Sequence, residues 1–205
     1  MLASVVLVAG CGSDESSTPT TTAPRPIDYQ SVATRIDAEA LDDSARDCVF
    51  DVDAIIDAVA GSLPVADTYD DEGVENFLYA TTDIGPFPVL YCNLHPENNG
   101  DGKPGEIDRL RVVLSTSAAA DPAEYLGFHV STGGQELVFA DEEPLLEGSV
   151  TSTCLDDGSF CAAFWQGDGL WAAVVLFASE DDAFTGGAAA QVLGIVLPLA
   201  LADLS

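Results

Sequence analysis

The run LWAAVVLFA, residues 170–178, is apolar at every position and constrains the fold more than any other stretch of the sequence. Alternate side chains of a strand point to opposite faces of a sheet. A strand in this run therefore has two apolar faces, one made by Leu170, Val174 and Leu176 and the other by Trp171, Val175 and Phe177. A strand with one wet face alternates apolar and polar residues, so we expect both faces to be covered.

One cover is a C-terminal helix, because residues 180–204 begin with acidic side chains and then become strongly apolar. Pro198 and several glycines interrupt this helix, which argues against a membrane span. The other cover is a second helix of the chain, a bound lipid or a partner protein. Phe164 and Trp165, on the preceding predicted strand, fit the same three interpretations.

The remaining segments predict an α+β domain. Apolar residues spaced three to four apart predict one helix from about Tyr29 and another that ends near Gly61, and a short helix is predicted over 121–128. Short or alternating apolar runs predict strands at 87–94, 107–117, 135–140, 149–155, 160–165 and 170–178. We expect an antiparallel sheet of about five to six strands, with helices packed mainly on one face and two disulfides.

The first residues of the chain have the pattern of an export signal. Leu2 to Gly10 is an uncharged, mostly apolar run that ends in small residues directly before Cys11, although no Lys or Arg precedes it. The order LVAGC, residues 7–11, resembles a bacterial lipobox, which implies cleavage before Cys11 and attachment of lipid to that cysteine. We expect a lipoprotein signal peptide over 1–10, the lipidated Cys11 with a disordered Ser/Thr/Pro tether over 11–28, and one extracytoplasmic domain over 29–205.

Four cysteines remain for this domain: Cys48, Cys92, Cys154 and Cys161. An even number in an exported chain predicts two disulfides, which four cysteines can form in three ways. Cys154 and Cys161 flank LDDGSF, a sequence typical of a hairpin turn, and Cys48 and Cys92 then pair by elimination. No pair has the CxxC spacing of a zinc site.

The lipobox, the Thr/Pro tether, Cys48 at the start of a helix and Cys92 in a strand are together similar to actinobacterial cell-envelope lipoproteins of unknown function. They are more loosely similar to the two-disulfide extracellular sensor domains of actinobacterial receptor kinases. The lipobox is the specific part of this resemblance, and the domain pattern covers Cys48 to about Gly127. The resemblance implies an envelope role on the outer face of the cytoplasmic membrane and offers no catalytic residues.

Acidic residues far outnumber basic ones, with 35 Asp and Glu against 6 Lys and Arg and a formal net charge of -29. Nucleic acid is excluded as a partner, because its binding requires a basic patch. The acidic surface keeps the domain solvated and attracts cations or a basic partner. Arg109 and Arg111 share one face of a predicted strand, where they pair with local acids or hold a phosphate or carboxylate group of a ligand.

The loop ENNGDGK, residues 97–103, carries the one metal hypothesis of the sequence. Its oxygen-bearing side chains follow the first half of a calcium loop and Asp108 falls at the twelfth position, so the candidate ligands are Glu97, Asn99, Asp101 and Asp108. Asn and Gly are also the commonest hairpin residues, and the flanks predict strands. We therefore expect a plain turn, with no cofactor, and keep calcium as the alternative.

Catalytic motifs are missing from the sequence. His95 and His129 are the only histidines, and neither a GxSxG nor an HExxH pattern surrounds them. No spacing of carboxylates points to a glycosidase pair. We therefore expect a protein that is not an enzyme.

The sequence predicts a lipid-anchored extracytoplasmic lipoprotein that acts as a non-catalytic binding or interaction module of the cell envelope. Its partners are the membrane, through the anchor, and an unidentified envelope protein or apolar ligand. The alternative is a carrier of an apolar envelope ligand such as a lipid, which needs a sealed apolar pocket rather than an exposed patch or cleft; a calcium-binding module and a hydrolase are remote alternatives. The expected ligand or partner contacts are Trp165, Trp171, Phe177, Arg109 and Arg111.

Overall fold

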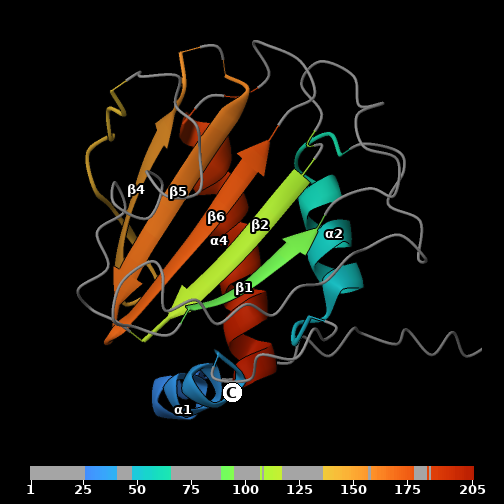
Figure 1. Cartoon of the computed structure of the whole chain (residues 1–205), viewed down its shortest axis with the longest axis vertical. Coiled ribbons are helices and arrows are strands. Elements are labelled where there is room, and N and C mark those ends of the chain that lie inside the picture. Colours follow the sequence, from blue (N-terminus) through green and yellow to red (C-terminus); the bar gives the residue numbers. More distant parts are fainter. Residues whose placement is uncertain are drawn as a thin grey trace, which may run out of the picture.

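The computed structural model describes the chain in several ranges: 26–40, 48–65, 89–94, 107, 109–116, 136–156, 158–177, 184 and 186–205. Within these ranges the chain forms one six-stranded antiparallel sheet and three helices (Figure 1). The predicted signal peptide, Cys11, the tether to Arg25, the predicted helix over 121–128, both histidines and the four candidate calcium ligands lie outside the described residues.

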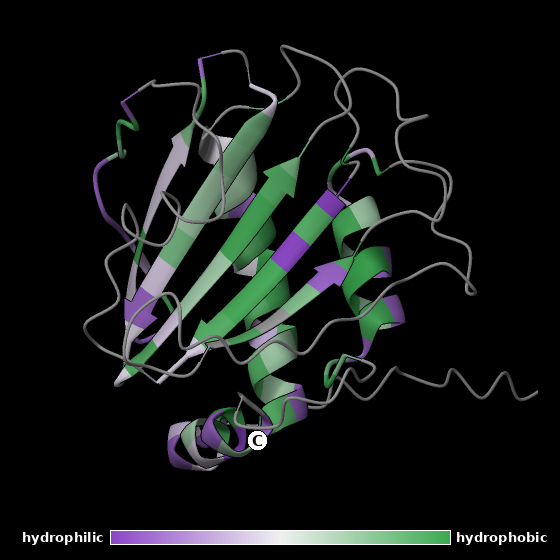
Figure 2. Ribbon diagram, viewed as in Figure 1, coloured by the Kyte–Doolittle hydropathy of each residue, from purple (hydrophilic) through white to green (hydrophobic). Residues whose placement is uncertain are grey.

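The sheet has the strand order β1-β2-β6-β5-β4-β3, and each neighbouring pair is antiparallel. The strands are β1 (Val89–Leu94), β2 (Arg109–Ser115), β3 (Glu143–Leu145), β4 (Gly148–Cys154), β5 (Phe160–Gly167) and β6 (Leu170–Phe177). The apolar run is thus β6, and it lies inside the sheet between β2 and β5, where Figure 2 shows its hydrophobic character.

A tight turn joins β5 to β6. Asp168 has φ 47° and Gly169 has φ 77°, so both central residues adopt the left-handed conformation that a type I′ hairpin turn requires. The Asp-Gly pair supplies this conformation at low steric cost, because Gly has no Cβ and Asp tolerates it better than most residues. The turn fixes the register in which Gln166 lies opposite Trp171.

The segment before β3 differs from the sequence prediction. A strand was expected over 135–140, but residues 136–140 are extended without being part of the sheet, and the short β3 lies further along the chain. The Ala140 amide donates to the Ser152 carbonyl at 2.7 Å, while the hydroxyls of Thr151 and Thr153 donate to the carbonyls of Ala140 and Val138. The hydroxyls of Thr151 and Thr153 thus donate to backbone carbonyls that, in a regular strand pair, would accept from backbone amides.

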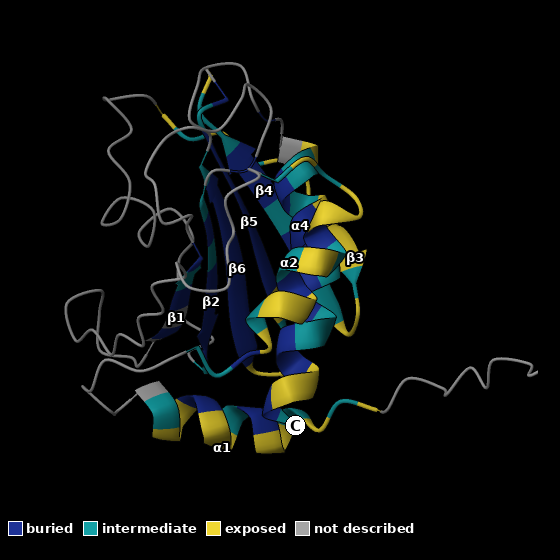
Figure 3. Cartoon of the chain, turned by 90° about the vertical axis from the view of Figure 1, so that its right-hand side faces the viewer, coloured by how far each residue is buried: buried dark blue, intermediate teal, exposed yellow. Residues whose placement is uncertain are grey.

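The helices are α1 (Tyr29–Ala40), α2 (Val52–Ala60) and α4 (Gly186–Leu204). Figure 3 shows α2 and α4 on the same side of the sheet, here called the helix face, and α1 across one end of it. Asp51 caps α2 by accepting a hydrogen bond from the Ala54 amide at 3.0 Å, and α2 ends before Gly61 as expected. The prediction of helices mainly on one face is confirmed.

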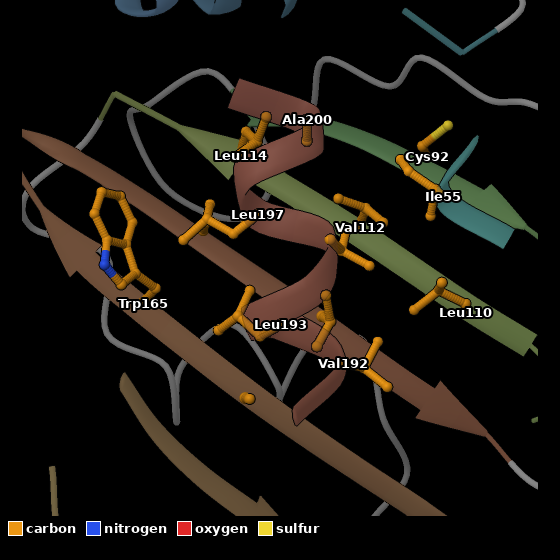
Figure 4. Packing of buried hydrophobic residues seen from close by; sticks show 14 of the residues in the cluster. Ile55, Cys92, Leu110, Val112, Leu114, Trp165, Val192, Leu193, Leu197 and Ala200 are labelled. Carbon is orange, nitrogen blue, oxygen red and sulfur yellow. The ribbon is translucent and has the colours of Figure 1, made fainter. Parts of the chain in front are cut away.

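The C-terminal helix α4 provides most of the cover on the helix face. Its buried residues recur at three- and four-residue spacing: Ala189, Val192, Leu193, Val196, Leu197, Ala200, Leu201 and Leu204. The helix packs on β5, β4 and β6, and Figure 4 shows Val192, Leu193, Leu197 and Ala200 of this stripe in the same apolar cluster as Leu110, Val112 and Leu114 of β2. Residues 187–204 are long and apolar enough to cross a membrane by length and composition, and 44% of them are buried inside the domain. We interpret α4 as a core helix because its stripe packs on the sheet.

Asp203 at the end of α4 ties the three helices together. Its carbonyl accepts a hydrogen bond from Arg35 Nη1 of α1 at 2.8 Å, and its carboxylate accepts one from the Asp51 amide beside α2 at 2.8 Å. A cation at a helix C-terminus also interacts favourably with the helix dipole. These contacts hold α1 and α2 against the helix that covers the sheet.

The opposite side of the sheet, here called the second face, carries a separate apolar cluster. Its buried members are Val113, Phe160, Ala162, Phe164, Trp171, Ala173 and Val175. Leu137 and Phe139 pack on this cluster from the extended segment before β3, and Phe139 lies 6.0 Å from Phe164 between ring centroids. Trp171, Ala173 and Val175 of β6 are buried on this face, which confirms the expectation that both faces of β6 are covered. The predicted helix over 121–128, one candidate for this cover, lies outside the described residues.

Two disulfides join the pairs that the sequence favours, Cys48–Cys92 and Cys154–Cys161. The first ties the residues before α2 to the edge strand β1, with 5.8 Å between the Cα atoms. The second links directly opposed residues of β4 and β5 and closes the hairpin between them. Both bridges fit the two-disulfide extracellular domain that the sequence predicts.

Candidate functional site

A cleft of about 130 Å³ opens beside the turn between β5 and β6. Its walls come from β4, β5, β6 and the segment before β3: Glu142, Ser149, Thr151, Phe164, Trp165, Gln166 and Trp171. The register pairs Ser149 with Gln166 and Gln166 with Trp171, so these three side chains form one row across the second face. The cleft is therefore built on three hydrogen-bonded strands, which hold its lining residues in fixed positions.

Phe164 and Trp171 form the floor of the cleft. Their ring centroids are 5.7 Å apart with 33° between the ring planes, and the two residues are 2% and 1% exposed. Phe139 also packs on Phe164, with 59° between the ring planes. Because both rings are almost completely buried, they close the bottom of the cleft and leave its polar rim as the part that a ligand contacts.

Polar side chains make the rim. Glu142 and Gln166 are exposed, and Ser149 and Thr151 are half-buried. The Thr151 hydroxyl donates to the Ala140 carbonyl at 2.7 Å, which fixes the segment that carries Glu142 to the edge of β4. The rim thus offers a carboxylate acceptor, an amide that can donate and accept, and hydroxyl groups.

Trp165 borders the cleft, yet it belongs to the helix-face core and is fully buried. Its indole Nε1 donates to the Leu145 carbonyl at 2.8 Å, and its ring stacks on Tyr29 with 6.4 Å between centroids. Gly148 and Gly167 pair beside the indole; a Cβ atom on Gly148 would lie 2.6 Å from Nε1. Trp165 therefore supports the site by fixing the β3–β4 turn and the start of α1.

This end of the sheet is electrostatically negative. Burial raises the pKa of the Tyr29 phenol above its ordinary value, and the carboxylates of Glu147 and Asp168 raise it further. Glu142 adds a third carboxylate at the cleft itself. No lysine or arginine follows Arg111 in the sequence, so no basic side chain of the strands β3–β6 or of α4 offsets these charges.

The structure separates the five predicted contact residues into two groups. Trp165 and Trp171 line the cleft, whereas Phe177 lies six positions further along β6, about 20 Å away at the rise of an extended strand. Arg109 lies opposite Phe177, with its guanidinium carbon 5.0 Å from the ring centroid. Arg111 Nε donates to Asn93 Oδ1 at 2.6 Å. The two arginines share the second face as predicted, but they lie far from the cleft.

A second cleft of about 160 Å³ lies on the other side of the same segment, between β4 and the start of α4. Its lining includes the carboxylates of Asp141 and Glu143. Among the residues that the structure describes, no group of three or more His, Cys, Asp or Glu side chains could hold a metal ion. The two carboxylates of this second cleft therefore do not form a metal site with any other described residue. The candidate calcium ligands of the sequence lie outside the described ranges.

Sequence reasoning missed most of the rim. The sequence predicts Ser149 and Thr151 to lie within the strand over 149–155 and assigns Glu142 to no predicted strand or helix. The available signal was that Ser149, Thr151 and Gln166 fall on the same face as Trp171, which follows from the strand period once the hairpin registers are known. Placing Glu142 beside them required the path of the segment before β3.

No protein-family model matches the chain, and comparison with curated proteins and with solved structures finds no match either. The arguments for function therefore come from the fold, the cysteine pairing and the cleft. Of the features that resemble actinobacterial envelope lipoproteins, the described residues include the two disulfides of the domain.

Proposed function

We propose that this chain is a lipid-anchored extracytoplasmic lipoprotein that acts as a non-catalytic binding module, with the cleft beside the β5–β6 turn as its binding site. The cysteine pairing carries this proposal. All four cysteines of the domain are joined in disulfides, which supports an oxidising compartment. Cys11 remains, directly behind the apolar run and the LVAG sequence, where a lipidated cysteine belongs.

The cleft supports a binding role over transport of a lipid. It holds about 130 Å³ and has a carboxylate, an amide and hydroxyls on its rim. A pocket that encloses a molecule of lipid size needs several hundred Å³ and an apolar lining. The apolar residues of the second face pack against one another and against Leu137 and Phe139, which favours a small polar contact site over an acyl-chain channel.

The lining also supports a non-catalytic role. Among the described residues that line the cleft, Glu142 is the one acidic or basic side chain, and it is exposed. Glycoside hydrolysis by a pair of carboxylates requires two such groups at matched positions. Binding requires no second titratable group.

The tether and α1 place the cleft relative to the anchor. At about 3.1 Å per extended residue, residues 12–26 allow the domain to stand up to ~45 Å from the lipid. The tether reaches the domain at Tyr29, whose ring stacks on Trp165 at the border of the cleft. The binding site therefore lies at the end of the domain where the tether is attached.

Replacing Cys11 by serine tests the anchor. In an actinobacterial host, we expect the parent chain in the membrane fraction and in the detergent phase after phase separation. The Cys11→Ser chain is expected in the aqueous phase, because a serine hydroxyl cannot form the thioether that carries the lipid, and the anchoring energy of about 0.8 kcal/mol per buried CH₂ group is lost.

The matched control is Ser13→Ala, which changes a neighbouring residue and leaves the cysteine in place. This variant is expected to remain with the membrane. Equal partitioning of the Cys11→Ser and parent chains into the detergent phase would refute the anchor.

A further inference from the structure

We propose that residues 136–142, here called the edge strap, close the outer edge of β4 against strand addition by a second copy of this chain. This edge is open to pairing beyond residue 150, because β3, the neighbour of β4 on that side, pairs with residues 148–150. An open edge presents backbone groups that another strand can join. The proposal goes beyond the binding function of the cleft, since it concerns the state of assembly of the domain.

Alternation along β4 determines which backbone groups face the outer edge. The Leu155 amide donates to the Phe160 carbonyl at 3.0 Å, so these two residues form a hydrogen-bonded pair. The next pair, Cys154 and Cys161, is then a non-hydrogen-bonded one, and its Cα separation of 4.0 Å agrees with this. The amides and carbonyls of Ser152 and Cys154 therefore point away from β5, toward the outer edge.

Hydrogen bonds hold the edge strap along this side of β4. The Ala140 amide donates to the outward carbonyl of Ser152 at 2.7 Å. The Thr151 hydroxyl donates to the Ala140 carbonyl at 2.7 Å, and the Thr153 hydroxyl donates to the Val138 carbonyl at 2.8 Å. In Figure 1 the segment runs beside β4 at the border of the sheet. The strap thus takes the place that an added strand would occupy, and side chains of β4 itself help to hold it there.

An extra residue keeps the edge strap from becoming a regular edge strand. Between the bond from Ala140 to Ser152 and the start of β3 opposite Val150, the strap has two residues where β4 has one. Two residues against one is the arrangement of a β-bulge, which bends an edge and interrupts its ladder. The strap also carries three exposed carboxylates: Glu136, Asp141 and Glu142. A bent and charged edge discourages pairing with a further strand.

The edge strap has one apolar side and one exposed side. Leu137 and Phe139 pack on the second-face cluster, and Phe139 lies 6.0 Å from Phe164 between ring centroids. Val138 lies between them in the sequence and is 78% exposed. The strap therefore rests on the sheet through two apolar side chains and the hydrogen bonds above. Opening such a segment costs less free energy than unfolding the strands beneath it.

A second copy of the chain is the partner that the open edge fits. β4 has the sequence GSVTSTC, which is uncharged and rich in β-branched residues, in a chain of formal net charge -29. Two copies can therefore pair as antiparallel β4 strands about a two-fold axis, and no carboxylate of one β4 faces a carboxylate of the other. The acidic side chains belong to the strap, which moves aside when the edge opens.

The test removes the bonds that hold the strap. In the double variant Thr151→Val and Thr153→Val, each side chain keeps its branched shape and loses its hydroxyl donor. Ala140→Pro is an independent second variant: it removes the amide that donates to β4, at an exposed position. The matched control is Thr34→Val, which removes a hydroxyl that donates to a backbone carbonyl within α1.

Two measurements are made on each full chain in a polyoxyethylene detergent. In hydrogen exchange followed by mass spectrometry, we expect the strap to exchange about tenfold faster, or more, in both test variants, with β6 unchanged. In sedimentation equilibrium at matched detergent density, we expect the parent and Thr34→Val chains to be monomers. Both test variants should form dimers with a Kd on the order of 10 µM, since the new interface is small. Residues 150–154 should exchange more slowly in the dimer than in a dilute sample.

Exchange of the strap at the parent rate in both test variants would overturn the proposal, because these bonds would not hold it. A strap that opens while the chain remains a monomer, or a dimer that protects residues other than 150–154, would show that the strap does not close this edge. A parent chain that is already a dimer through β4 would show the same. Faster exchange throughout β6 in both test variants would show that residues 136–142 belong to the core of the domain.

Discussion

Replacing both Cys48 and Cys92 by alanine is expected to lower the free energy of unfolding by about 4 kcal/mol. The disulfide closes a long loop, with a sequence separation of 44, so its loss returns much conformational entropy to the unfolded chain. It also joins the residues before α2 to the edge strand β1, and it is the one disulfide between these two elements in the described part of the chain. The melting temperature should fall by roughly 10 °C for a domain of this size.

The matched control is the alanine double variant at Cys154 and Cys161. That disulfide has a sequence separation of 7, so the same entropy relation gives a loss of about 2.5 kcal/mol. Chemical denaturation followed by Trp fluorescence measures both variants under identical conditions. This account of the two bridges would be contradicted if the variant at Cys154 and Cys161 lost as much stability as the variant at Cys48 and Cys92, or more.

Trp165→Ala is expected to destabilise the domain by about 3–5 kcal/mol. The indole is fully buried, and its Nε1 donates to the Leu145 carbonyl at 2.8 Å. Truncation leaves a cavity beside Gly148 and Gly167, which have no side chains with which to fill it. It also removes the ring on which Tyr29 stacks. The loss therefore combines a cavity, a broken hydrogen bond and a weakened attachment of α1.

Trp165→Phe separates these contributions. It keeps an aromatic ring beside Tyr29 but removes the donor to Leu145, so we expect a loss of about 1–3 kcal/mol. Amide hydrogen exchange supplies a local readout: the amides of α1 should exchange faster in Trp165→Ala than in Trp165→Phe, relative to those of β6. Unchanged protection of α1 in Trp165→Ala would show that the indole does not hold this helix.

The apolar pattern of β6 made much of the fold predictable from the sequence. Side chains that alternate along Leu170–Phe177 indicated two covered faces, and the structure divides them between the helix-face core and the second-face cluster as the period requires. The cysteine pairing was also predictable, because Cys154 and Cys161 flank a turn sequence and leave one other pair. These features depend on local spacing, which a sequence displays directly.

The candidate site was much less predictable. Trp165 and Trp171 were both expected to contact a ligand or partner, yet they lie in the cores of opposite faces. Trp165 directly follows Phe164 on β5, so the two side chains point to opposite faces, and Trp171 shares the face of Phe164. The rim depends on Glu142, whose position is set by a hydrogen bond from Thr151 to Ala140 rather than by any periodic pattern. Such contacts between an irregular segment and a strand leave no repeat in the sequence, so propensity and hydrophobic spacing do not reveal them.

The most direct test of the central claim is the intact mass of the full chain, extracted with detergent from the membrane of cells that express it. The account predicts a polypeptide that begins at Cys11, carries the added mass of its lipid, and is four hydrogens lighter than the fully reduced chain because Cys48–Cys92 and Cys154–Cys161 are formed. A chain that retains residues 1–10, carries no lipid and has free thiols at those four positions would contradict it.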